Sequence, residues 1–216
     1  MHSIRRIALF GIVFNLCFAA CKKEEATQRF EGRVLRGNNG GALSGVRVEA
    51  QTQELGNGVF NSEYSTLAST ATDGTGNYRI PFEMATYTSL RLEFTKSQYH
   101  RRWVDVDPSH FDQNDVFSKT VSLYPQATIA LRISDGSAEY NQIQFRYKDI
   151  DFECTCCNDS WKVIDQPNMD TTISCMVYGD QMVHYQYRWI ATGVDSLVQD
   201  SIYCPAFTTQ NIDLNY

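Results

Sequence analysis

The sequence lacks the short motifs that mark the large enzyme families. It contains no G-x-S-x-G nucleophile elbow, no H-E-x-x-H zinc motif, no P-loop and no dinucleotide-binding fingerprint. Histidine is scarce, and His100, His110 and His184 lie far apart without a recognisable signature. A cysteine nucleophile would need such a base beside it. We therefore expect a protein that is not an enzyme and that needs no cofactor.

The sequence also has no excess of basic over acidic residues. The chain has 19 Lys and Arg residues against 25 Asp and Glu residues, a formal net charge of -6. Nucleic acid is bound by clusters of Lys and Arg, so we expect no nucleic-acid partner. The same balance argues against electrostatic adhesion to anionic lipid.

Amphipathic helical stretches are scarce, whereas strand-forming residues are plentiful. Val46, Val48 and Ala50 alternate with polar residues, which is the period-two pattern of a half-buried strand. Similar short segments, separated by Gly, Asn and Asp turns, recur along the whole chain. This pattern predicts an all-β fold of two tandem β-sandwiches.

The N-terminal segment has the architecture of a secretory signal. Arg5 and Arg6 precede a mostly apolar run over residues 7–18, which is too short to span a bilayer. Two small residues, Ala19 and Ala20, then precede Cys21. Cleavage there would remove residues 1–20, including both arginines and no acidic residue, and would change the formal net charge from -6 to -8.

The junction before Cys21 resembles the lipobox of bacterial lipoproteins. The resemblance implies that Cys21 is acylated, that the lipid membrane is a partner through this residue, and that the protein is an outer-membrane lipoprotein. Residues 22–25, KKEE, resemble the signal that follows the acylated cysteine in surface-exported lipoproteins of Bacteroidota. We expect residues 21–28 to form a short polar tether. The alternatives are that residues 22–25 are only part of this solvated tether, and that residues 1–20 are an ordinary secretory signal.

Residues 29–125 form the first predicted sandwich. The segments G-x-V at residues 32–34, L-S-G-V-x-V at 43–48 and T-D-x-x-G-x-Y-x-I at 72–80 resemble the carboxypeptidase regulatory-like domain. The resemblance implies a prealbumin-like sandwich and leaves the activity open, because a fold does not carry a function. Related collagen-adhesin repeats hold an isopeptide bond that starts from a first-strand lysine. Residues 29–36 contain no lysine, so we expect no such crosslink.

Residues 126–216 form the second predicted sandwich, after a boundary at Tyr124 and Pro125. Its strands are indicated by periodicity alone, which favours an immunoglobulin-like or fibronectin III-like sandwich. We find no convincing repeat between the sequences of the two halves.

The cysteines beyond Cys21 all lie in this second half. An exported protein can keep disulfides, so we expect two bridges and one unpaired thiol. Metal binding is the alternative, although the C-x-C-C spacing fits zinc poorly. The candidates are Cys154, Cys156, Cys157, Cys175 and Cys204.

Three further sets of residues, one acidic and two aromatic, are candidates for binding. An acid-rich segment could hold calcium, although it lacks EF-hand spacing and fits a solvated loop as well; its candidates are Asp105, Asp107, Asp112 and Asp115. Aromatic residues form two candidate ligand-contact sets, Tyr99 with Trp103, and Tyr185 with Tyr187 and Trp189. The second set alternates on one face, which fits a sandwich core or an exposed sugar-binding platform.

Together these features predict a membrane-anchored, non-catalytic binding or scaffold module whose partner is another envelope protein or a glycan. An enzyme or accessory subunit acting on glycans or peptides, and a calcium-dependent adhesin, are the alternatives.

The anchor is tested by Cys21→Ser. Serine cannot form the thioether to the lipid, so we expect the variant to leave the membrane fraction or to stay unprocessed. Fractionation and labelling with a radioactive fatty acid measure this. Wild-type protein that takes up no fatty acid would contradict the assignment.

Overall fold

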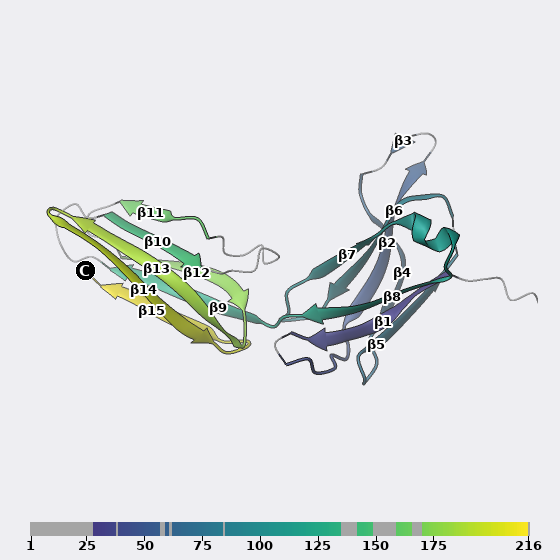
Figure 1. The fold of residues 1–216 in the computed structure, drawn as a ribbon, viewed down its shortest axis with the longest axis horizontal. Helices are drawn as coiled ribbons and strands as arrows, with labels where there is room; N and C mark the ends of the chain where they lie inside the picture. Colours follow the sequence, from purple (N-terminus) through teal and green to yellow (C-terminus); the bar gives the residue numbers. More distant parts are fainter. Residues whose placement is uncertain are drawn as a thin grey trace, which may run out of the picture.

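The computed structural model describes residues 28–37, 39–56, 59–60, 62–83, 85–134, 142–148, 159–165 and 170–215. Within these residues, strands account for nearly all regular structure, and one short 3-10 helix is present. The predicted all-β fold of two sandwiches is confirmed, and Figure 1 shows the sandwiches lying end to end. None of the described residues forms a helix with the length and apolar character needed to cross a bilayer.

The first sandwich has a three-stranded sheet packed on a larger one. The smaller sheet has the order β5 (Asn77–Phe82), β1 (Gln28–Arg36) and β8 (Val116–Leu123). In the larger sheet β2 (Arg47–Gly56), β6 (Tyr87–Thr95) and β7 (Arg102–Val106) are neighbours, and both β3 (Val59–Phe60) and β4 (Ser65–Ala71) pair with β2. The 3-10 helix η1 (Pro108–Asp112) connects β7 to β8.

The second sandwich is built in the same way. Its smaller sheet has the order β12 (Asp170–Tyr178), β9 (Gln126–Ser134) and β15 (Thr209–Asn215). Its larger sheet has the order β11 (Lys162–Asp165), β10 (Gln142–Lys148), β13 (Gln181–Ala191) and β14 (Val194–Cys204).

The two sandwiches therefore share one strand order, which the sequence does not reveal. In each, the first strand is central in the smaller sheet, antiparallel to one neighbour and parallel to the last strand, β8 or β15. An immunoglobulin domain instead places its first strand beside its second, in a sheet without the last strand. The order of the second sandwich thus differs from the immunoglobulin-like order expected, because period-two alternation specifies which face is buried but not which strands are neighbours.

Each sandwich has its own hydrophobic core. The alternation predicted in the first half is present in β5, where Tyr78, Ile80 and Phe82 are buried and the residues between them are exposed. The first core extends along the chain from Phe30 to Leu123, and the second from Ala127 to Leu214. The stretch between the two cores contains the predicted boundary at Tyr124 and Pro125.

The residues of the motif that resembles the regulatory-like domain make hydrogen bonds within the fold. The buried Thr72 hydroxyl accepts from the Val46 amide at 2.9 Å and donates to the Leu43 carbonyl at 2.7 Å. The Asp73 carboxylate accepts from the Thr75 hydroxyl and from the amides of Asn77 and Thr75, and these hydrogen bonds lower its pKa. The motif therefore holds loops and turns in place.

Gly32 is required by a close approach of two backbones. It lies in β1 with φ at 153°, and a Cβ atom there would be 1.9 Å from the Lys119 carbonyl oxygen of β8. The Tyr78 hydroxyl donates to this same oxygen at 3.0 Å. Only glycine allows β8 to lie this close at this point.

The two sandwiches meet in a junction built from hydrogen bonds and ring contacts. Two backbone hydrogen bonds form here. The Gln126 amide donates to the Gln98 carbonyl at 2.8 Å, and the Gly179 amide donates to the Pro125 carbonyl at 2.7 Å. The ring of Tyr124 stacks on that of Tyr178 with centroids 4.4 Å apart. Such a pair contributes about 0.5–1.5 kcal/mol beyond its buried area.

Charged and imidazole groups complete this junction. Arg36, at the end of β1, donates to the Asp180 carboxylate at 2.6 Å, and its guanidinium lies 5.8 Å from the centre of the Phe207 ring. The His100 Nε2 lies 3.0 Å from the Val177 carbonyl oxygen, which can only accept, so this nitrogen carries the proton. Burial lowers the pKa of His100 and favours the neutral ring at pH 7.

We predict that Gly32→Ala destabilises the first sandwich by at least about 3 kcal/mol, because the new methyl group meets backbone and the φ is unfavourable for alanine. Denaturant unfolding measures the change. Gly74→Ala is the matched control, since nothing lies within 4 Å of a Cβ atom at Gly74. Equal midpoints for the two variants would contradict the close approach.

Candidate binding surfaces

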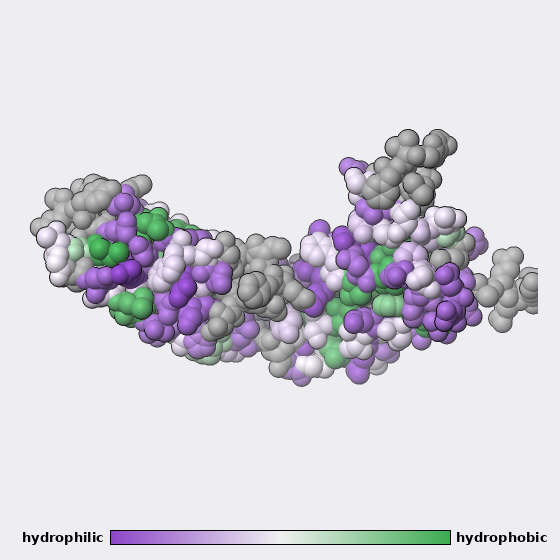
Figure 2. Space-filling model, turned by 45° about the horizontal axis from the view of Figure 1, so that its top comes forward, coloured by the Kyte–Doolittle hydropathy of each residue, from purple (hydrophilic) through white to green (hydrophobic). Residues whose placement is uncertain are grey.

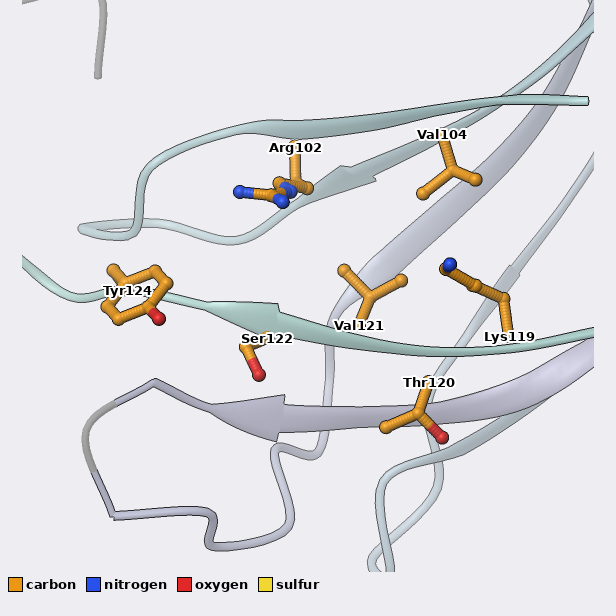
Figure 3. Close-up of a pocket in the computed structure, with 7 residues that line it drawn as sticks. All are labelled: Arg102, Val104, Lys119, Thr120, Val121, Ser122 and Tyr124. Atoms are coloured by element: carbon orange, nitrogen blue, oxygen red, sulfur yellow. The ribbon is translucent and has the colours of Figure 1, made fainter. Parts of the chain in front are cut away.

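A groove runs between β7 and β8, the outer strands of the two sheets of the first sandwich. In the described part of the chain, no strand pairs with the outer edge of either. The groove has a volume of about 360 Å³. Figure 3 shows Val104 and Val121 pointing toward one another between the strands, with Arg102 and Lys119 beside them.

This arrangement can accept an extended chain. Unpaired strand edges present backbone N–H and C=O groups in the order that a further strand needs. The two valines give the groove an apolar floor, and the two cations favour an acidic occupant. The sequence gives no signal for this groove, because the groove depends on which strands lie at the edge of each sheet.

The two aromatic residues of the first candidate set lie in different surroundings. Tyr99 is half-buried and meets Phe207 of the second sandwich, with ring centroids 5.5 Å apart. Trp103 lies on β7 with 44% of its surface exposed, and the Arg101 guanidinium is 5.8 Å from its ring centre. Trp103 is therefore accessible to a ligand, whereas Tyr99 belongs to the junction.

The second aromatic set forms core rather than a platform. Tyr185 is buried, and Tyr187 and Trp189 are partly buried against the second hydrophobic core. The Tyr185 hydroxyl lies 3.2 Å from the Asp200 carboxylate, to which it donates. Of the two interpretations of this set, the burial favours the sandwich core over the exposed platform. Figure 2 shows a face on which hydrophilic residues predominate and hydrophobic ones form small groups.

Two of the four acidic candidates for calcium are engaged by other groups. Asp105 pairs with Arg91 at 2.6 Å, and Asp107 caps η1 by accepting from the Ser109 amide at 2.9 Å. This capping lowers the pKa of Asp107. Asp112 and Asp115 are exposed, and no group of three or more His, Cys, Asp or Glu side chains gathers among the described residues.

The cysteines are described in part. Cys175 is disulfide-bonded, whereas Cys204, another candidate, has a buried free thiol. Cys154, Cys156 and Cys157 lie outside the described residues, as does Cys21. The pattern of bridges therefore stays a prediction. Burial raises the pKa of the Cys204 thiol to about 11, which suppresses the reactive thiolate.

Comparison with known proteins gives only distant structural likenesses. No protein-family model and no curated protein matches the sequence. A 9R-lipoxygenase from Cyanothece PCC8801 is 13% identical, with a TM-score of 0.34 over 45% of this chain and 16% of that one. A streptococcal ancillary pilin is 15% identical, with a TM-score of 0.30 over 89% and 63%. A putative cell adhesion protein from Bacteroides ovatus is 8% identical, with a TM-score of 0.29 over 87% and 91%.

The chain thus spans less than two thirds of the length of the lipoxygenase and of the streptococcal pilin. At this level of similarity these structures assign no function to the chain.

We predict that Cys204 is not alkylated by iodoacetamide at pH 8 in the folded protein. With a pKa of about 11, only roughly 0.1% of the thiol is ionised at that pH, and the side chain is buried. Mass spectrometry of protein treated before and after denaturation measures this, and the denatured sample is the control. Full labelling of Cys204 in folded protein would contradict the burial.

Proposed function

We propose that the protein is a non-catalytic outer-membrane lipoprotein in which two sandwiches form a stiff rod anchored through acylated Cys21. In this role the first sandwich is the spacer nearest the membrane, and the second lies farther out. The rod acts as a binding or scaffold module of the envelope, exposed at the cell surface.

The direction of the strands is the observation that carries this proposal. The chain enters β1 beside Asp115, where the Arg29 amide donates to the Asp115 carbonyl, and leaves β1 at Arg36 in the junction. It enters β9 at the junction and ends β15 at the opposite end of the second sandwich, where Asn215 meets Ser134. Figure 1 shows β1 beginning and β15 ending at opposite ends of the molecule.

The length of the strands sets the reach of such a rod. β1 and β9 each contain 9 residues. At about 3.3 Å per residue, the two strands in line extend over roughly 60 Å. An anchor near residue 28 would then hold the far end of the second sandwich well clear of the lipid headgroups.

The junction supports stiffness rather than free rotation. Its backbone hydrogen bonds, the Tyr124–Tyr178 stack and the Arg36–Asp180 ion pair all connect the two sandwiches. A flexible linker would lack such cross-contacts and would let the domains move independently.

We predict that Arg36→Ala combined with Tyr178→Ala loosens the rod, because the pair of changes removes the ion pair and the ring stack. Small-angle X-ray scattering of the chain from residue 21, carrying Cys21→Ser, measures the spread of overall dimensions. The expected result is a narrow distribution for the parent and a broad one for the variant. The control is Arg132→Ala, which removes an exposed ion pair with Asp170 on the second sandwich. An equally broad distribution for the parent would overturn the stiff-rod proposal.

A further inference from the structure

A basic cleft lies beside the junction, and Tyr99 of the first aromatic candidate set is among its lining residues. It has a volume of about 510 Å³, within the range of small-ligand sites. Its lining comes from both sandwiches. Arg47 begins β2, most of the other residues lie at the end of β6 or between β6 and β7, and Gln126 begins β9. We call it the junction cleft, and its lining residues are Gly45, Arg47, Thr95, Lys96, Ser97, Tyr99, Arg101 and Gln126.

The charge of the junction cleft is opposite to that of the whole protein. Arg47, Lys96 and Arg101 line it, and no acidic residue does, although the chain carries a net charge of -6. Cations that line one cleft of an otherwise acidic protein attract anions to that cleft. This favours an anionic ligand.

The cations are held in place by the fold. The Lys96 ammonium donates to the Ser44 carbonyl at 2.9 Å, which uses one of its three donors. Arg47 pairs with Glu49 through Nη2 at 2.6 Å, and Arg101 pairs with Glu93 through Nε at 3.0 Å. Each guanidinium carries five N–H donors, so these contacts orient the group without exhausting it. Pre-oriented donors lower the entropy lost when a ligand binds.

The remaining lining matches a sugar. Thr95, Ser97 and Gln126 offer hydroxyl and amide groups suited to sugar hydroxyls. The Tyr99 ring is held in the lining by its contact with Phe207. Beyond Arg101, the exposed Trp103 continues this surface along β7 and offers a ring face for stacking.

We propose that the junction cleft binds an anionic polysaccharide, whose carboxylate or sulfate groups engage Arg47, Lys96 and Arg101. The inference adds a ligand class to the proposed scaffold role. It does not depend on the membrane anchor. The binding test on protein without the lipid can fail while the anchoring proposal stands, and the anchoring proposal can fail while binding is observed.

The test is isothermal titration of the soluble chain, Cys21→Ser from residue 21, at about 0.15 M salt, where weak surface attraction is largely screened. The probes are polygalacturonate for carboxylates, heparin for sulfates and dextran as a neutral polymer. We expect polygalacturonate or heparin to bind and dextran not to bind. Binding of polygalacturonate would identify carboxylates as the recognised groups, and binding of heparin would identify sulfates. Binding of neither, or equal binding of dextran, would overturn the proposal.

Variants assign the binding to the cleft. We expect Arg47→Gln with Lys96→Gln to weaken binding at least about tenfold, because two charged donors are lost. Arg132→Gln with Arg188→Gln is the matched control: it removes two charges from the second sandwich, both from exposed ion pairs, and should leave affinity nearly unchanged. Equal weakening by both pairs would show non-specific charge attraction and overturn the site. Thermal melts verify folding, and Lys96→Gln alone serves if the double variant does not fold.

Discussion

In each sandwich the last strand pairs in parallel with the first, and this pairing governs the shape of the molecule. Because β8 runs in the same direction as β1, the chain must leave the first sandwich at the end opposite to the one where it entered. The pairing of β15 with β9 imposes the same rule on the second sandwich. Two such units joined in sequence lie end to end, as Figure 1 shows. An antiparallel first and last strand would instead place the entry and the exit of each sandwich at the same end.

The parallel pairing depends in turn on the close approach of backbones at Gly32. There the Lys119 carbonyl of β8 occupies the space that a side chain at position 32 would need. The Tyr78 hydroxyl of β5 donates to that carbonyl. Thr72 and Asp73 fix the loop and turn that lead into the strand of Tyr78. The residues that resemble a known domain family are thus the ones that shape the sandwich, which is why they indicate a fold and leave the ligand open.

The surfaces suited to binding lie at the edges of the sheets and at the junction of the two sandwiches. The groove between β7 and β8 exists because both sheets end there, and the junction cleft exists because a second body closes the space beside the turn after β6. Both surfaces carry cations on an acidic chain. The ion pairs of Arg47 and Arg101 with neighbouring glutamates orient these groups, and in a solvent-exposed setting they contribute little to stability.

The all-β class and the strictly alternating strands such as β5 could be predicted from the sequence, because both depend on local period-two patterning. Tertiary structure alone decided which strands are neighbours, and so the shared order of the two sandwiches. It also decided that Tyr185 and its aromatic neighbours pack as core, and that Arg36 meets Asp180. These outcomes join residues far apart in the chain, and side-chain alternation carries no information about such partners.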